Sequence, residues 1–371
     1  MISEKISREE KLSLELRSLY RSYGYQYYRM SSFEPYDLYR ENKNFLVNQS
    51  VLTFTDLDGR LMALKPDITI SIAKDALTGH NGRKLFYSEH VFRRLPGAQQ
   101  FTELKQMGLE FIGGDTAYGE CEVLELASKT LAAISPAYSL EISHMGYISA
   151  FVEQLTDDMR QQQDFTEALS RKSAVDMKLA LAGKKLDDRE LQTIDILTSL
   201  PADPALALAG MEQACLNQRM LSACREAEKL LTYAESRGFG GNIRPEPSLM
   251  YDGEYYNGLV FKGYISGLPR AVLSGGRYDK LLQRFGKEQP ALGFALYFNE
   301  LQDMKVDSSD YDIDILLLYD DEPAEMVGKA VDFLVGQGWS VRAERQAPEN
   351  ITARKICSIR EIAECGKELK C

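Results

Sequence analysis

The chain has 371 residues, of which 44% are hydrophobic and 27% charged, so its length predicts two or three globular domains with a large core. Its formal net charge of -11 and its isoelectric point near 5.1 argue against a dedicated nucleic-acid binder, because an acidic surface repels phosphate. The sequence contains no run of about 18 apolar residues, which excludes a membrane-spanning helix.

The first part of the chain predicts a helix, a strand and a hairpin. Ser7 and Glu10 have the spacing of a capping box, and apolar residues at helical intervals follow them. Residues 25–30 are rich in aromatic side chains, which favours a strand. Residues 51–55 and 61–64 are strand-like and flank a turn with Asp and Gly, which indicates a hairpin.

The next segment predicts a helix followed by two long strands. Residues 66–77 begin with Pro-Asp and favour a helix. Residues 84–93 and 104–112 are strand-like, and the loop between them contains Pro96-Gly97. A further helix is predicted over about residues 119–133.

Composition changes near residue 155, where aromatic residues become scarce and Ala, Leu, Gln, Lys and Glu prevail. This change predicts a helical insertion over about residues 155–240 within a core domain at 1–305. The insertion helices are predicted over about residues 163–181, 187–199 and 210–237. Strand, helix, strand and helix are then predicted over residues 248–274, 277–285, 291–297 and 298–304, with Gly275-Gly276 before the first of these helices.

A polar linker at residues 307–312 leads into a small C-terminal domain, predicted over 312–371. Strand-like residues 313–319, helical residues 323–337 and strand-like residues 339–343 form the start of an α/β unit. Because few residues follow, we predict a truncated α/β domain.

The common catalytic and metal-binding motifs are absent from the sequence. It contains no phosphate loop, no nucleophile elbow and no zinc-protease motif. Its six cysteines form no C-x-x-C pair and its three histidines are scattered, so we expect free thiols, no metal and no cofactor. The charged N-terminal segment lacks the apolar core of a signal peptide, so a cytoplasmic location is expected.

Three segments, at residues 61–74, 86–113 and 250–300, carry a family resemblance. Their order, spacing and strand-loop-strand layout resemble class II aminoacyl-tRNA synthetases, specifically the histidyl-tRNA synthetase family. The resemblance covers about residues 8–303. It implies an α+β fold with an antiparallel sheet flanked by helices and a helical insertion. The C-terminal α/β domain is similar to a shortened anticodon-binding domain.

Asp67 and Thr69, in the segment LKPDIT, match the residues that bind the amino group in that family. A carboxylate near a strand end suits an ammonium group. The alternative is that Asp67 caps the helix that opens at Thr69.

Five further residues match positions of the family's amino-acid pocket. Arg93 matches the arginine that clamps the carboxylate and the α-phosphate. Gln106 and Glu110 lie four residues apart on one face of a strand and match positions that recognise the histidine side chain. Tyr256 and Tyr278 match two more pocket residues, and packing in an aromatic core is the alternative for both.

Other positions depart from the family pattern at the nucleotide site. Leu95 replaces a glutamate, whereas Tyr251 and Glu300 replace arginines, and the short loop offers Gln99 and Gln100 in place of charged residues. Adenylation needs cations where charge develops on phosphate, and the loss of one such group costs about 10²- to 10³-fold in rate. The resemblance therefore implies that the amino-acid pocket is partly kept while catalysis is lost.

This pattern implies a regulatory member of the family, whose partner is the short catalytic subunit of ATP phosphoribosyltransferase, the first enzyme of histidine biosynthesis. It also implies a hetero-oligomer inhibited by histidine, with no nucleic-acid ligand. Residues 31–39 match the family's dimer-forming first motif, so self-association is expected. A histidine-binding paralogue without that partner and a functional histidyl-tRNA synthetase remain open alternatives. The sequence also leaves open whether histidine acts in the retained pocket or between subunits.

Overall fold

The computed structural model describes residues 7–46, 50–75, 82–95, 97–114, 116–249, 255–302, 304 and 311–365. These residues divide into two compact units. The larger unit runs from Leu12 to residue 302, and the smaller unit contains residues 311–365 with residues 304 and 7–11. Among the described residues, no helix combines the length and the apolar character needed to cross a membrane.

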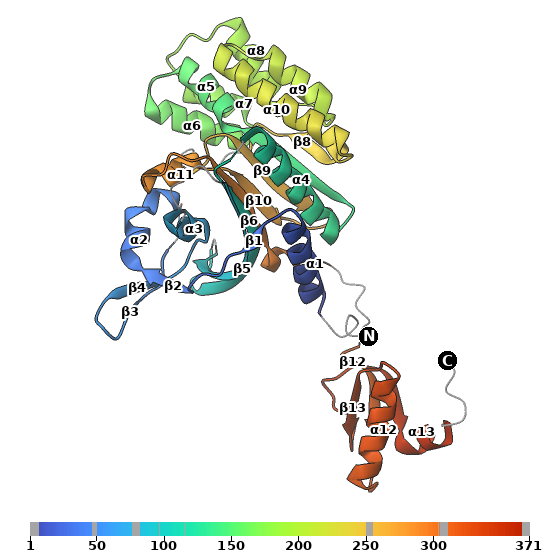
Figure 1. Cartoon of the computed structure of the whole chain (residues 1–371). Helices are drawn as coiled ribbons and strands as arrows, with labels where there is room; N and C mark the ends of the chain where they lie inside the picture. The colour runs from blue at the N-terminus through green and yellow to red at the C-terminus, as the bar shows by residue number, and fades with distance from the viewer. Residues whose placement is uncertain are drawn as a thin grey trace. The chain divides into compact units, whose positions relative to one another are not determined.

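A mixed sheet of eight strands forms the framework of the larger unit (Figure 1). In their order across the sheet, the strands are β1 (Gln26–Tyr27), β5 (Arg83–Arg94), β6 (Phe101–Ile112), β11 (Ala291–Tyr297), β10 (Leu273–Arg277), β9 (Leu259–Ile265), β7 (Tyr138–His144) and β8 (Ile243–Pro245). The inner pairings are antiparallel, whereas β1 joins β5 and β8 joins β7 in parallel. The predicted α+β fold built on a largely antiparallel sheet is confirmed.

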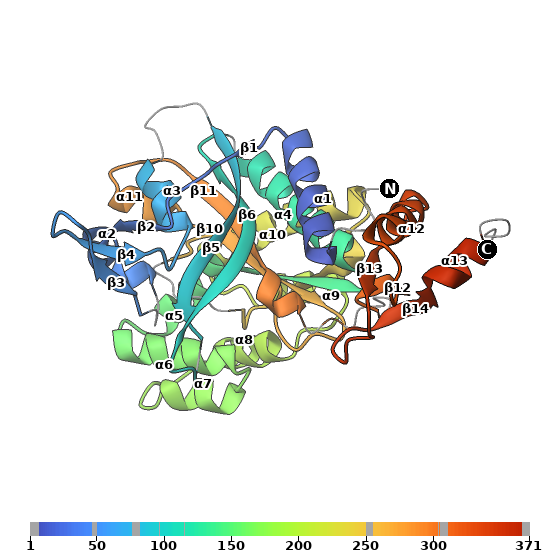
Figure 2. The same cartoon turned by 90° about the horizontal axis from the view of Figure 1, so that it is seen from below.

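Alternation along the strands gives the sheet one apolar face. Phe86 of β5, Leu109 of β6 and Phe294 of β11 are neighbours in register, so their side chains point to the same side. Helices α1 (Arg8–Ser22) and α4 (Thr116–Ile134) cover this side (Figures 1 and 2). Tyr20 of α1 packs edge-on against Phe86 with ring centroids 5.9 Å apart, and its hydroxyl pairs with Thr130 of α4 at 2.9 Å. Each fully buried aromatic ring contributes about 2–3 kcal/mol to this core.

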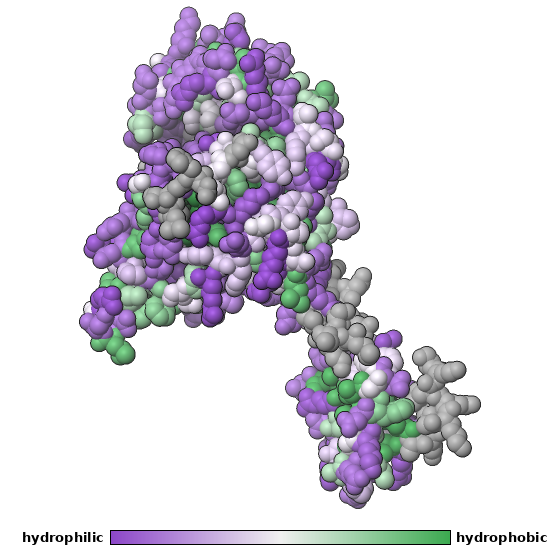
Figure 3. Space-filling view, in the orientation of Figure 1, coloured by the Kyte–Doolittle hydropathy of each residue, from purple (hydrophilic) through white to green (hydrophobic). Residues whose placement is uncertain are grey.

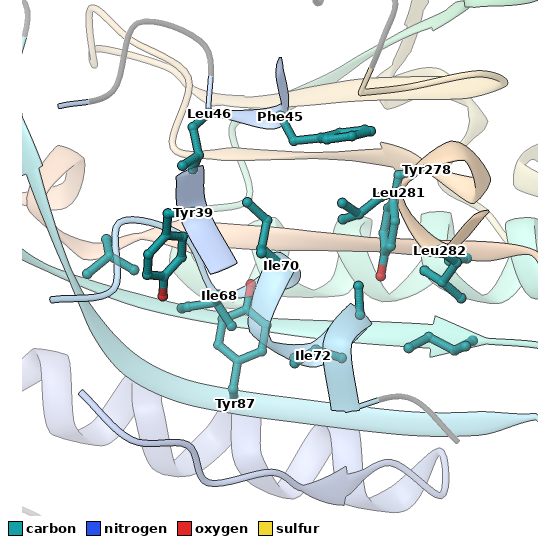
Figure 4. Packing of buried hydrophobic residues seen from close by; sticks show 14 of the residues in the cluster. Tyr39, Phe45, Leu46, Ile68, Ile70, Ile72, Tyr87, Tyr278, Leu281 and Leu282 are labelled. Carbon is teal, nitrogen blue, oxygen red and sulfur yellow. The ribbon is translucent and has the colours of Figure 1, made fainter. Parts of the chain in front are cut away.

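The opposite side of the sheet is covered by short elements. These are the small antiparallel sheet of β2 (Phe33–Pro35), β4 (Leu61–Leu64) and β3 (Thr53–Thr55), and the helices α2 (Tyr36–Glu41), η1 (Lys43–Phe45), α3 (Thr69–Asp75) and α11 (Asp279–Arg284). Their buried side chains form one cluster with residues of the large sheet (Figure 4). Tyr39, Ile70 and Tyr278 are at most 2% exposed in this cluster.

Six helices lie between β7 and β8; the first, α5, precedes the insertion predicted over about residues 155–240, and the other five occupy it. They are α5 (Met145–Leu155), α6 (Met159–Ser170), α7 (Ala174–Ala180), α8 (Asp188–Thr198), α9 (Pro204–Gln213) and α10 (Gln218–Ser236), and the 3₁₀ turn η2 (Gly240–Asn242) follows. Each helix from α6 to α10 begins at a side chain that accepts a backbone N–H: Asp158, Ser173, Asp187, Asp203 and Asn217. Each such cap contributes about 1 kcal/mol. The single helix predicted over 163–181 is therefore two helices, because Lys172 adopts a φ of 53° and Ser173 starts a new cap.

The smaller unit contains a parallel sheet of three strands. The central strand β12 (Ile313–Leu318) lies between β13 (Val341–Glu344) and β14 (Ala353–Ser358). Helix α12 (Ala324–Gly336) connects β12 to β13, as predicted, and α13 (Ile359–Cys365) follows β14. Leu317 and Leu334 are buried between α12 and the sheet.

Further predicted elements differ from the structure. The single helix predicted over residues 210–237 is the end of α9 followed by α10, with residues 214–217 between them. The strand expected over residues 25–30 is limited to β1, and the helix expected over 298–304 is the short 3₁₀ turn η3 (Phe298–Leu301). Gly275 and Gly276 lie inside β10 rather than before a helix. A Cβ on Gly275 would lie 2.3 Å from the carbonyl oxygen of Gly293, so glycine at this position permits close strand packing.

Candidate functional site

A polar cavity of about 340 Å³ opens on the side of the sheet opposite α1 and α4. All of the residues predicted to bind a ligand line it: Asp67, Thr69, Arg93, Gln106, Glu110, Tyr256 and Tyr278. The fold thus brings together side chains from β5, β6, the start of α3 and the loop before it, the loop before β9, and the N-cap of α11. Their convergence is a finding, whereas their role in binding histidine stays a prediction.

The floor of the cavity comes from strand alternation. Gln106 and Glu110 of β6 point to the cavity side, and their neighbours in register on β11 are Tyr297 and Gly293. A side chain on Gly293 would collide with the glutamate, because a Cβ there would lie 1.9 Å from Oε2 of Glu110. Glycine at this position therefore makes room for the Glu110 carboxyl group.

Glu110 is a buried carboxyl group held by two hydroxyls. Its side chain is 2% exposed, and it accepts hydrogen bonds from Thr69 Oγ1 at 2.9 Å and from Tyr278 Oη at 2.5 Å. Burial raises the pKa of Glu110 to about 8, although both hydrogen bonds favour the ionised form. Near neutral pH this carboxyl group can hold or release a proton. In its ionised form it can accept a hydrogen bond from a ligand that donates an N–H.

Asp67 serves two groups through its two oxygens. Oδ1 accepts the backbone N–H of Ile70 at 2.9 Å and so holds the first turn of α3. Oδ2 lies 3.5 Å from Nη2 of Arg93, whose Nε donates to the Pro66 carbonyl oxygen at 2.5 Å. Burial raises the pKa of Asp67, and the adjacent Arg93 guanidinium opposes that rise. The helix-capping alternative is therefore correct for one oxygen, while the other faces the cavity arginine.

Aromatic side chains form the wall above this floor. The Tyr255 ring packs at a tilt against Tyr256, with centroids 4.6 Å apart, and edge-on against Phe45, with centroids 6.0 Å apart. Tyr278 is 2% exposed and packs in the core cluster while its hydroxyl reaches Glu110, so it has a packing role and a polar role together. Several lining residues were missed by the sequence analysis: Phe45, Ile68, Tyr87, Tyr255, Ser274, Gly293, Phe294, Ala295 and Tyr297. Period-two alternation on the predicted strand 291–297 was a usable signal for the last of these.

The three positions at which the sequence predicts the loss of catalytic residues lie outside this cavity or outside the described residues. Leu95 packs partly buried against the core cluster rather than lining the cavity. Glu300 lies in η3, where it accepts a hydrogen bond from Asn299 at 2.7 Å and stands 3.9 Å from Arg270. Tyr251 falls outside the described residues.

The charge of the cavity suits an amino acid better than a nucleotide. Among the described residues that line it, Arg93 is the one cation; it lies beside Asp67, and Glu110 supplies a second carboxyl group. A triphosphate would meet too little positive charge there. In the described part of the chain, no cluster of His, Cys, Asp and Glu side chains could hold a metal ion. Cys121, Cys215, Cys224 and Cys357 are free thiols.

The fold and the cavity together define a protein of the class II aminoacyl-tRNA synthetase type. The histidyl-tRNA synthetase family matches residues 1–301, and the chain belongs to this family.

Three known proteins that are similar to this chain show which members of the family it resembles. An ATP phosphoribosyltransferase regulatory subunit from Acetivibrio thermocellus is 24% identical over 365 residues, which cover 95% of this chain and 87% of that protein. The structure of an ATP phosphoribosyltransferase regulatory subunit/histidyl-tRNA synthetase from Bacillus halodurans has a TM-score of 0.75 at 22% identity, covering 94% of this chain and 93% of that chain. A chain of the ATP phosphoribosyl transferase (HisG:HisZ) complex from Thermotoga maritima has a TM-score of 0.62 at 16% identity, covering 79% and 98%. The two structures share the fold, and the curated relative belongs to the regulatory class predicted from the sequence.

Proposed function

We propose that this chain is the non-catalytic regulatory subunit of an ATP phosphoribosyltransferase and that histidine is the ligand of its cavity. The observation that carries the proposal is the cavity itself. Among its described lining residues Arg93 is the one cation; it lies 3.5 Å from Asp67, whose side chain is 13% exposed, and the cavity also contains the buried carboxyl group of Glu110. Those groups suit the two charges of an amino acid, but they do not suit a polyphosphate.

Histidine offers one complementary group to each part of the cavity. Its ammonium group pairs with Asp67 and its carboxylate with Arg93, which lie within 3.5 Å of each other. Its imidazole N–H donates to Glu110, the carboxyl group that Thr69 and Tyr278 hold in place. Gln106, 3% exposed on the same strand, adds an amide that can donate or accept.

Regulation follows from linkage between this cavity and the catalytic partner. A ligand shifts an assembly only by its difference in affinity for two states of that assembly. A coupling of about 1–3 kcal/mol gives roughly 5- to 150-fold control of the partner's activity. The regulatory subunit then needs no catalytic activity of its own, and the small number of cations in the cavity supports this.

Reconstitution tests the proposal. The purified chain is mixed with a short ATP phosphoribosyltransferase catalytic subunit from the same source, and phosphoribosyl-ATP formation is followed with and without histidine. Activity that needs both chains and falls with histidine is expected. No complex and no change in activity would remove the regulatory assignment and favour a histidine-binding paralogue without this partner.

Substitutions in the cavity test whether histidine inhibits by binding in the cavity or at a site between subunits. Gln106→Ala and Tyr278→Ala are expected to weaken inhibition by histidine, because both side chains line the cavity. Gln283→Ala, an exposed residue of α11, is the matched control. Inhibition that survives both cavity substitutions would place the sensor between subunits instead.

A synthetase activity is the alternative that the family itself raises. Histidine-dependent exchange of pyrophosphate into ATP measures adenylation directly. We expect none, because the cavity offers one cation among its described lining residues. Detectable exchange would overturn the non-catalytic assignment.

Self-association and a cytoplasmic location are part of the same proposal. The predicted dimer motif, residues 31–39, forms β2 and the first part of α2 beside an exposed edge of the small sheet. Light scattering at micromolar concentration is expected to give the mass of a dimer, and a monomer would contradict it.

A further inference from the structure

The helices α5 to α10, called the helical body here, have a core of their own. Among the described residues, this core is a cluster of buried apolar side chains from residues 147–224 alone. Figure 3 shows mainly hydrophilic side chains on the surface of the helical body. The body meets the rest of the larger unit along α10, which packs against α4 and β7. Contacts at this junction therefore fix the position of the body relative to the sheet.

His144 lies at the junction, at the end of β7 and directly before α5. Its side chain is 12% exposed, and its Nε2 lies 3.0 Å from Oε2 of Glu226 on α10. Its Nδ1 is buried and has no hydrogen-bond partner among the described residues, so the contact with Glu226 orients the ring. A Cβ on Gly146 would lie 3.0 Å from the ring, so glycine at this position makes room for the imidazole.

The residue after His144 is in contact with the wall of the ligand cavity. The N–H of Met145 donates to the carbonyl oxygen of Gly258 at 2.9 Å. Met145 belongs to a small buried cluster against which Tyr256 packs, and Tyr256 lines the cavity. The backbone that carries His144 is thereby joined to a side chain that is predicted to bind the ligand.

A second connection runs through Arg277, which directly precedes Tyr278 in the chain. Its Nε lies 2.8 Å from Oδ2 of Asp279, and its Nη1 lies 3.3 Å from Oε1 of Glu120 on α4. Burial raises the pKa of the Glu120 carboxyl group, and Arg277 and His144 both oppose that rise. Glu120 is therefore close to both side chains and links the segment that holds Tyr278 to the junction.

We propose that His144 is a positioning residue that couples ligand binding in the cavity to the position of the helical body. A ligand held by Tyr256 and Tyr278 binds most tightly when the contacts of His144 are intact, because both tyrosines are then fixed on the cavity wall. By linkage, the bound ligand favours the same position of the helical body. This inference rests on the proposed function, which supplies histidine as the ligand, and it names the part of the chain that responds to that ligand.

Calorimetric titration of the full chain with histidine tests the coupling. Glu226→Ala is expected to weaken histidine binding by about 10-fold, and because Glu226 is 45% exposed, its removal leaves no cavity in the core. Glu226→Gln should restore most of the affinity, because an amide can still pair with the imidazole. Glu228→Ala, an exposed residue of the same helix, is the matched control and should bind histidine like the wild type. Wild-type affinity in Glu226→Ala would overturn the coupling, whereas a wild type that binds no histidine would overturn the proposed ligand as well.

Amide hydrogen exchange measures the reciprocal effect. Saturating histidine should slow exchange in α10 of the wild type and of Glu228→Ala, but not in Glu226→Ala. A contact that only stabilised the fold would change exchange in the free protein, without this dependence on the ligand. If histidine binds to the wild type and exchange in α10 stays the same, the coupling is overturned and the proposed ligand stands.

Discussion

Replacing Glu110 by glutamine should stabilise the folded protein above neutral pH. Burial raises the pKa of Glu110 from 4.5 to about 8, so the folded chain keeps a proton that the unfolded chain has lost between these pH values. Stability therefore falls as pH rises from about 4.5 to 8, and the whole penalty is present above 8. Glutamine resembles the protonated acid and carries no such penalty.

The magnitude follows from the pKa. A rise from 4.5 to about 8 corresponds to about 5 kcal/mol. We expect Glu110→Gln to gain about 3–5 kcal/mol over the wild type between pH 5 and pH 9. Because Thr69 and Tyr278 both pair with the carboxyl group, the amide keeps hydrogen-bonding partners.

Guanidinium chloride unfolding at pH 5, 7 and 9, followed by circular dichroism, measures this difference. Glu15→Gln, an exposed residue of α1, controls for the loss of one carboxylate. A stability difference between wild type and Glu110→Gln that is constant from pH 5 to pH 9 would refute the reasoning, since it would mean that Glu110 is equally ionised in both states.

Three further predictions concern stability. Although burial opposes it, hydrogen bonds from Arg237, Lys129 and Tyr233 lower the pKa of Glu125 to about 2, so its contribution to stability is present above pH 4.5 and is lost as pH falls toward 2. Glu125→Gln should cost about 2 kcal/mol in urea unfolding at pH 7, and an equal cost at pH 2 would contradict this. Gly293→Ala should cost about 3 kcal/mol, because its Cβ would collide with Glu110, and an unchanged melting temperature would argue against the close packing. Lys65→Met should cost about 3 kcal/mol, because it leaves the carboxylate of Glu89, 2.8 Å from the fully buried lysine, without its partner. Adding Glu89→Gln should recover most of that loss, and a double variant as unstable as Lys65→Met would refute the pairing argument.

Patterns among neighbouring residues were sufficient to predict several helices and strands of this protein. The strand-like character of residues 84–93, 104–112 and 291–297 predicted three strands that the structure contains. The capping pattern of Ser7 and Glu10 is also present, with the N–H of Ser7 3.0 Å from Oε2 of Glu10. Each of these signals depends on neighbours within a few residues.

Part of the candidate site was predictable from the family resemblance rather than from local sequence patterns. The resemblance supplied Asp67, Arg93 and Glu110, and the fold brings them to one cavity. It could not supply Tyr87 or Tyr255, because an aromatic residue in a strand or loop looks the same whether it faces a cavity or a core. Nor could it decide between capping and ligand contact for Asp67, since both oxygens are in use and only their positions in space separate the roles.

The sequence by itself determined the family, the order of the elements and the group of residues to test. Tertiary structure alone decided which side of the sheet carries the cavity and that Gly293 makes room for Glu110. Hydrophobic periodicity is a local property, so it can be recognised in the amino-acid sequence alone. Burial, which sets the pKa of Glu110, arises only when segments far apart in the chain exclude water together.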